Sequence, residues 1–352
     1  MNGDPHTSGA TVGLSGRVVR GSTAGQADRG TPVVDLRGRV HRSRKDLPVA
    51  LDGIDLQVMP GEAFGLVGPD GAGKTTLMRL LCGLLKPSAG DLRVFDEALP
   101  AGIDRIKPRI GYVSQRFSLY GDLTIQENLD FFADIHGVRG KVAKERKEAL
   151  LAFTRLTPFR KRLADRLSGG MRQKLSLICT LVHEPELLLL DEPTTGVDPI
   201  TRRDFWSILS TLLEQGLTIV MSTPYLDEAE RCGRVALVDR GRVLASGTPD
   251  QLRRGSTLRV LEVVCSPVRD AADSLAGAPG VADVHSFGDR LHVLLGGDSP
   301  AADQAEILAG RLRGQGIEVR AARPVTAGLE DVFIQLVQQG RDAAGPAPGG
   351  AP

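Results

Sequence analysis

The stretch from Gly68 to Thr76, GPDGAGKTT, has the residue types and the spacing needed to bind phosphate groups. It matches the pattern G-x-x-x-x-G-K-[ST] of a phosphate-binding loop. Its inner glycines allow backbone turns that direct several N–H groups at one phosphate. Lys74 adds a positive charge for the β- and γ-phosphates, and Thr75 offers a hydroxyl ligand for Mg²⁺. The predicted nucleotide-binding residues of this loop are Gly68, Pro69, Asp70, Gly71, Ala72, Gly73, Lys74, Thr75 and Thr76.

A second group of residues that could take part in a reaction is the consecutive pair Asp191 and Glu192. It follows four leucines, residues 187–190, which lack the alternation of a half-exposed strand. Such a run is typical of a strand buried on both faces of a parallel sheet. Its carboxyl end is where open α/β sheets place their ligands. We therefore predict that both carboxylates face the bound nucleotide.

The elements around these residues predict an α/β core. Residues 63–67 read as a buried strand and 76–82 as a helix, so the loop joins strand to helix as a phosphate-binding loop requires. Further predicted strands of the core cover residues 33–37, 51–58, 91–95, 109–113, 187–192, 216–222, 234–239 and 241–246. Between them, residues 125–136 and 141–156 carry apolar side chains at helical spacing. These two segments predict a helical insertion in the core.

A new succession of predicted strands and helices begins after about residue 255. Predicted strands at 258–264, 280–286, 290–295 and 317–323 alternate with helices at 268–276, 301–314 and 328–338, which indicates a small α+β unit. A ferredoxin-like topology is one arrangement that fits this order. The predicted organisation is a disordered tail at 1–31, a nucleotide-binding domain at 32–254 with its helical subdomain at about 116–170, an accessory domain at 255–339 and a second disordered tail at 340–352. The basic run at 37–45 favours a solvated loop over a segment beside the nucleotide.

Composition excludes several classes of protein. The 352 residues carry 44 Lys plus Arg against 43 Asp plus Glu, and only 4% are aromatic. The charge balance gives no general attraction to nucleic acid. The low aromatic content leaves few side chains on which bases could stack. The four cysteines are widely spaced and form no C-x-x-C pair, which fits a reducing cytoplasm. No run of 18 apolar residues predicts a membrane span.

Several motifs in this order resemble those of ATP-binding-cassette (ABC) ATPases over residues 33 to 250. Most specific is the segment 167–173, LSGGMRQ, which is similar to the signature loop of this family. The resemblance implies a P-loop NTPase core and a set of roles. Glu192 matches the catalytic glutamate that polarises the attacking water, and Asp191 the carboxylate that holds Mg²⁺. Gln115 matches the glutamine that reaches both the metal and this water. Ser168 and Gly170 would contact the γ-phosphate of ATP bound by an opposite cassette.

Within the family, the segments 112–120, 225–231 and 329–334 resemble subunits of drug, antibiotic or lipid exporters. In these exporters the ATPase is a polypeptide separate from the membrane permease. The resemblance implies ATP and Mg²⁺ as cofactors and two partners, a permease contacted after Gln115 and a second cassette, of the same or a different chain. It also implies a cytoplasmic position on the inner face of the cell membrane. Nucleic acid is not an expected partner.

The sequence departs from the family pattern at two places. Pro224 stands where the family usually has a histidine that touches the γ-phosphate, and proline offers no side-chain donor. The stretch 41–45 lacks the aromatic residue that stacks on adenine, so His41 or an arginine plane would have to replace it. A smaller difference is Asp70, where asparagine is common. Two alternatives therefore stay open, an ATP-binding regulatory module with weak or no hydrolysis, and a soluble ABC ATPase unrelated to transport.

Overall fold

A computed structural model describes residues 30–42, 49–115, 119–297 and 300–344 of the chain. These residues divide into two compact units: the first holds those up to Tyr225 together with Arg240–Arg242, and the second holds Leu226–Asp239 together with those from Val243 onwards. The domain boundary predicted near residue 255 rests on sequence pattern and stays a prediction. Most of the predicted tail at 1–31, and residues 345–352 of the other tail, lie outside the described residues. Residues 340–344 of that second tail belong to a helix.

The first unit is built on four parallel strands in the order β3-β8-β7-β6. Their bounds are β3 Ala63–Val67, β6 Ile110–Val113, β7 Leu187–Asp191 and β8 Thr218–Thr223. All residues of β3, β7 and β8 are buried, as the unbroken apolar run at 187–190 predicted. Parallel strands run in the same direction, so the segments that follow their carboxyl ends meet at one edge of the sheet.

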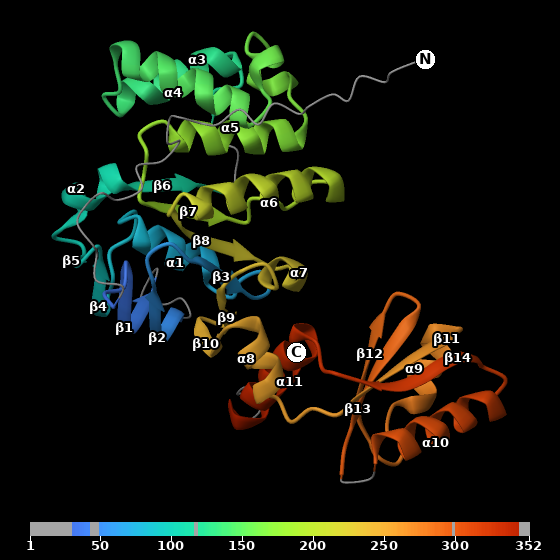
Figure 1. Cartoon of the computed structure of the whole chain (residues 1–352). Helices are drawn as coiled ribbons and strands as arrows, with labels where there is room; N and C mark the ends of the chain where they lie inside the picture. The colour runs from blue at the N-terminus through green and yellow to red at the C-terminus, as the bar shows by residue number, and fades with distance from the viewer. Residues whose placement is uncertain (1–29, 43–48, 116–118, 298–299, 345–352) are drawn as a thin grey trace, which may run out of the picture. The chain divides into compact units, whose positions relative to one another are not determined.

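An antiparallel sheet with the order β2-β1-β4-β5 completes the sheet structure of this unit. Its strands are β1 Val34–Arg42, β2 Val49–Val58, β4 Ala89–Val94 and β5 Glu97–Ala98. Helix α1, Lys74–Leu81, contacts β2 as well as β7 and β8, so it lies between the two sheets (Figure 1). The expected loop at 37–45 is wrong in its first part, because β1 continues to Arg42 along β2.

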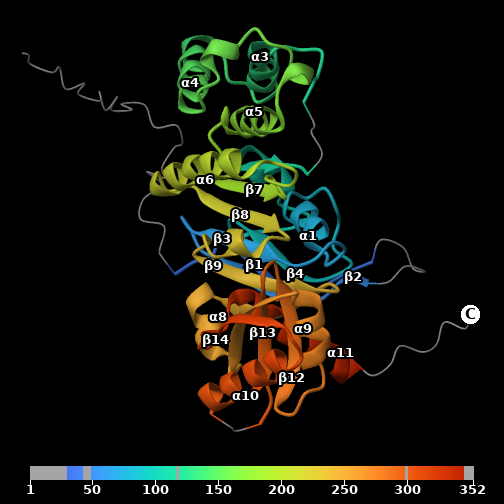
Figure 2. The ribbon, with the colours of Figure 1, turned by 90° about the vertical axis from the view of Figure 1, so that its right-hand side faces the viewer.

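Helices form a separate layer on the parallel strands (Figures 1 and 2). Helix α5 contacts α3, α4, α6 and strand β6, which places it between the helical insertion and the core. The helices of this layer are α3 Ile125–Ile135, α4 Gly140–Phe153, α5 Gly169–Leu181 and α6 Pro199–Glu214, with short 3₁₀ turns at Thr157–Phe159 and Ala164–Arg166. Helix α2, Ile103–Ile106, contacts β5 instead and continues into a 3₁₀ turn at Lys107–Arg109. Helix α3 begins at a capping box formed by Thr124 and Glu127.

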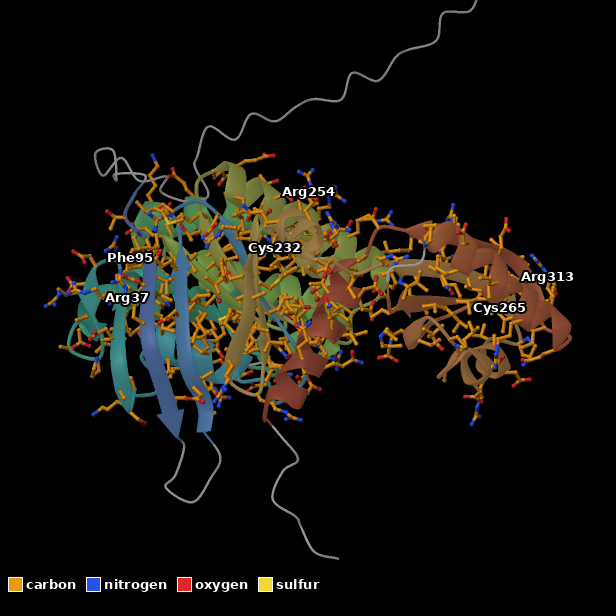
Figure 3. The ribbon with its side chains drawn as sticks, turned by 90° about the horizontal axis from the view of Figure 1, so that it is seen from below. Arg37, Phe95, Cys232, Arg254, Cys265 and Arg313 are labelled. Carbon is orange, nitrogen blue, oxygen red and sulfur yellow. The ribbon has the colours of Figure 1, made fainter. Side chains whose placement is uncertain are left out.

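The second unit contains the predicted hairpin and the small α+β fold. Its elements are α7 Leu226–Ala229, β9 Arg234–Asp239, β10 Arg242–Gly247, α8 Pro249–Gly255, β11 Val260–Ser266, α9 Val268–Leu275, β12 Val281–Phe287, β13 Arg290–Leu295, α10 Ala301–Gly314, β14 Glu318–Val325 and α11 Leu329–Ala344. The order β12-β13-β11-β14, with antiparallel pairs throughout, is ferredoxin-like and confirms that option. Buried side chains from β11, β13, α9 and α10 form its core, including Cys265 (Figure 3).

Helix α11 is tied to this sheet through a buried carboxylate. Asp331 is 1% exposed and accepts a hydrogen bond from the backbone N–H of Gly328 at 2.8 Å. His292 Nδ1 on β13 lies 2.9 Å from the same carboxylate. The two residues are 39 positions apart in the chain, so only the fold brings them together. The contact gives His292 a structural role. Among the described residues, no helix is long and apolar enough to cross a membrane.

Candidate functional site

The phosphate-binding loop joins β3 to α1, as predicted. Gly71 and Gly73 have φ angles of 80° and 103°, which side chains other than glycine rarely adopt. At Gly73 a Cβ atom would also lie 2.6 Å from the carbonyl oxygen of Ala50. The loop therefore needs glycine here for both conformation and space. Its backbone leads into the first turn of α1, where N–H groups have no partner within the helix and favour anions.

Lys74 and Glu192 form a buried ion pair at the foot of this loop. Lys74 Nζ lies 3.1 Å from Glu192 Oε1, with side chains that are 3% and 5% exposed. The same ammonium donates to the carbonyl oxygens of Gly68 at 2.8 Å and Pro69 at 3.0 Å. Gln115 Nε2 donates to Glu192 Oε2 at 2.9 Å. The structure thus brings together Lys74, predicted to bind the phosphates, and Gln115 and Glu192, predicted to act on the attacking water.

Asp191, fully buried, is the centre of a hydroxyl network. Its Oδ1 atom accepts from Ser222 at 2.6 Å and from Thr75 at 3.1 Å, while Tyr112 donates to Oδ2 at 3.3 Å. Burial, and then the charge of Asp191, raise the pKa of both Tyr112 and the Cys82 thiol. The neighbours of this carboxylate are therefore kept neutral.

The donor set suits Mg²⁺. This ion takes oxygen ligands and is usually held by one or two carboxylates together with phosphate oxygens, rather than by a full protein cage. Thr75 and Asp191 supply one hydroxyl and one carboxylate oxygen 3.1 Å apart, directly beside the phosphate-binding loop. No cluster of three or more His, Cys, Asp or Glu residues suited to a metal occurs in the described part of the chain. The residues present therefore fit a metal that is shared with a nucleotide.

The register of the parallel strands explains why these groups meet. Asp191 is paired with Ser222 across β7 and β8, and Val67 is paired with Thr223 across β3 and β8. The strand ends that carry the loop, the two carboxylates and the hydroxyls are thus neighbours at the carboxyl edge of the sheet. Ser222 and Tyr112 are site residues that were not predicted from the sequence. A hydroxyl at the end of the apolar run 219–221 was the available signal for Ser222.

The signature segment lies at the start of α5. Ser168 is its N-cap, with an exposed side chain whose Oγ accepts from the N–H of Met171 at 3.4 Å. Gly170 is buried, and a Cβ atom there would lie 1.9 Å from Cγ2 of Thr201 on α6. Glycine at this position therefore permits the close approach of the two helix starts. On α6, Asp198 is the N-cap, and hydrogen bonds from Thr201 lower the pKa of its carboxyl.

Three predicted features have different outcomes. Asp70 is exposed, so its carboxylate can remain in solvent away from the loop interior. Pro224 directly follows β8, in a bend of the chain beside the site. The side chain of His41 and all of residues 43–48 lie outside the described residues, so adenine stacking stays a prediction. Residues 116–118 after Gln115 lie outside them as well.

Together, a phosphate-binding loop and two consecutive carboxylates at the carboxyl edge of a parallel sheet define a P-loop nucleoside triphosphatase. The family model described as ABC transporter matches residues 51–195. A Nod factor export ATP-binding protein I from Cupriavidus pinatubonensis is 36% identical over 321 residues, which cover 87% of this chain and 91% of the relative. The chain belongs to the family of ABC transporter ATP-binding proteins, which confirms the resemblance stated from the sequence.

Two further likenesses are narrower. The probable multidrug ABC transporter ATP-binding protein YbhF of Escherichia coli (strain K12) is 44% identical over 207 residues, or 59% of this chain. The chain spans only 36% of the length of that relative. The solved dimeric ATP-binding cassette MJ0796, in a post-hydrolysis state with ADP and Pi, has a TM-score of 0.56 and 25% identity. The match covers 61% of this chain and 98% of that one.

Proposed function

We propose that this chain is the ATP-hydrolysing subunit of an ABC exporter, which powers transport of a drug, an antibiotic or a lipid through a separate membrane permease. The observation that carries the proposal is the convergence of Lys74, Asp191 and Glu192 at one edge of the parallel sheet. A relative of which the chain covers 91% is named for Nod factor export, which supports export as the direction of transport.

The chemistry follows from the positions of these residues. Lys74 and the backbone N–H groups of the loop bind the phosphates, and phosphoryl transfer depends mainly on such positioning and charge neutralisation. The carboxylate of Glu192, held by Gln115 at 2.9 Å, orients the attacking water and accepts hydrogen bonds from it. Thr75 and Asp191, with Gln115, would hold Mg²⁺, which supplies positive charge to the phosphate oxygens when bound.

A second cassette completes the site in this proposal. Ser168 is exposed at the start of α5, where helix N–H groups without a partner favour an anion. It is therefore available to the γ-phosphate of ATP held by another cassette, together with the backbone at Gly170. The solved relative MJ0796 is a dimer, which supports such pairing. A copy of this chain and a different cassette both satisfy the requirement.

The permease is the proposed membrane partner. The segment after Gln115 contacts its cytoplasmic side, so the chain is held at the inner face of the cell membrane. Hydrolysis removes the phosphate that bridges the two cassettes, and their separation moves the permease. Co-purification with an integral membrane protein tests this part, and a chain that behaves only as a soluble ATPase would contradict it.

Turnover by the purified chain tests the enzyme assignment. We expect Mg²⁺-dependent release of phosphate from ATP and its loss in Glu192→Gln. Glu186→Gln is a matched control, because Glu186 pairs with Arg109 before β7 begins, away from the loop. Pro224 favours one alternative, a regulatory module that binds ATP with weak or no hydrolysis. Binding of Mg-ATP without measurable turnover in the parent protein would support that module.

A further inference from the structure

Ser222 lies beside both carboxylates of the site, and the proposed function gives it no role. Its hydroxyl lies at the end of β8 and is completely buried. The Oγ atom donates to Oδ1 of Asp191 at 2.6 Å and accepts from the backbone N–H of Glu192 at 3.0 Å. One hydroxyl thus joins the side chain of the first carboxylate residue to the main chain of the second.

The bond to Glu192 acts on an unusual backbone. Glu192 has a φ angle of 49°, in the left-handed region that residues other than glycine rarely occupy. Such a conformation persists only where surrounding contacts impose it, and it recurs at active sites. Its N–H is held by both Oγ and the carbonyl oxygen of Ser222, the latter at 3.1 Å. This turn directs the Glu192 side chain towards Lys74 and Gln115.

The bond to Asp191 fixes the direction of its carboxylate. Of its three hydroxyl donors, Ser222 makes the shortest bond, at 2.6 Å against 3.1 Å for Thr75 and 3.3 Å for Tyr112. Thr75 is also a proposed metal ligand, whereas Ser222 is held in the sheet by its pairing with Asp191. Partners of a metal-binding carboxylate set its orientation and commonly affect metal affinity and rate.

We propose that Ser222 is a positioning residue for ATP hydrolysis, which sets the Asp191 carboxylate for the metal and the Glu192 turn for the attacking water. The inference rests on the proposed roles of Asp191 and Glu192. A purely structural serine would instead satisfy buried polar groups, and its removal would lower stability without a specific effect on the chemical step. The two roles therefore differ in what they change.

Three variants test the proposal. Ser222→Ala removes the hydroxyl without adding atoms, and Ser222→Thr keeps it. Ser210→Ala is the matched control, because the Ser210 hydroxyl bonds to the Trp206 carbonyl within α6, away from the two carboxylates. For Ser222→Ala we expect kcat to fall about 10- to 100-fold and KM for Mg-ATP to rise about tenfold, in step with weaker binding of the metal. Ser222→Thr should recover most of the turnover, and Ser210→Ala should match the parent.

Two measurements do not depend on turnover. Mn²⁺ is titrated into each variant with a non-hydrolysable ATP analogue and followed by electron paramagnetic resonance, and ATP binding is measured without metal. Ser222→Ala should bind Mn²⁺ about tenfold more weakly and metal-free ATP as the parent does. The proposal is overturned if kcat of Ser222→Ala stays within about twofold of the parent, or if metal-free ATP binding falls as much as kcat. It is also overturned if Ser222→Thr, with the melting temperature of the parent, is as slow as the alanine variant.

Glu192→Gln separates this inference from the proposed function. If that variant keeps the turnover of the parent, the assignment of Glu192 fails and the proposal for Ser222 fails with it. If Glu192→Gln loses turnover while Ser222→Ala does not, only the proposal for Ser222 fails.

Discussion

The buried pair of Lys74 and Glu192 predicts that neutralising the glutamate strengthens ATP binding. The Lys74 ammonium is the group that the proposed function assigns to the phosphates, and in this structure it lies 3.1 Å from Oε1 of Glu192. A triphosphate must therefore share this cation with a carboxylate of the protein. Glu192→Gln removes the competing charge and keeps the shape of the side chain. The lysine stays anchored, because it also donates to the carbonyl oxygens of Gly68 and Pro69.

The size of the effect can be worked from the geometry. Two unit charges 3.1 Å apart attract by about 5 kcal/mol at an effective dielectric constant of about 20. Desolvation of both groups opposes this attraction, and hydrogen bonds to charged groups contribute about 1.5–3 kcal/mol net. Since about 1.4 kcal/mol corresponds to a tenfold change in affinity, we expect Glu192→Gln to bind ATP about 10- to 100-fold more tightly.

Calorimetric titration of ATP without metal measures this change directly, since hydrolysis then does not interfere. Glu186→Gln is the control for loss of a negative charge elsewhere in the same unit, and it should bind ATP as the parent does. Unchanged or weaker binding by Glu192→Gln would refute the reasoning, because Glu192 would then not compete for the lysine.

Three other predictions follow from single residues. Pro224→His supplies the missing donor and should raise the ATPase rate about tenfold or more, whereas an unchanged rate would remove the idea that proline slows hydrolysis. Gly170→Ala should lower the free energy of unfolding by about 1–3 kcal/mol in urea titrations, because its Cβ would lie 1.9 Å from Cγ2 of Thr201. Thr201→Ser removes that methyl group and should restore the lost stability in the double variant. If the effects of the two substitutions on stability simply add, the clash is contradicted. Burial, with the stacked His136, lowers the pKa of His183 from 6.5 to about 4. The unfolded chain therefore binds an extra proton between these values, so stability should fall by up to about 3 kcal/mol as the pH drops from 6.5 to 4. His183→Gln should lose most of this slope in unfolding curves, and a parent-like slope would count against the assignment.

Much of the core and the site was predictable because the signals are local. The phosphate-binding loop needs glycines and a lysine at fixed spacing, so Lys74 and Thr75 can be identified from nine consecutive residues. The buried run before Asp191 identifies the strand that presents both carboxylates. The sequence predicted the ferredoxin-like topology only as one possible arrangement, because the succession of strands and helices does not determine which strands pair. The end of β1 was misjudged, since pairing with β2 holds the basic residues up to Arg42 in a strand.

By itself, the sequence determined the chemistry that the chain carries, because turn geometry, charge and apolar runs act over a few neighbouring residues. Only the tertiary structure decided which groups touch. Asp191 and Ser222 are 31 positions apart, and Glu192 and Gln115 are 77 apart. Both contacts exist because parallel strands with long connections end at the same edge of a sheet. No local pattern records that register, which depends on how side chains from distant segments pack together.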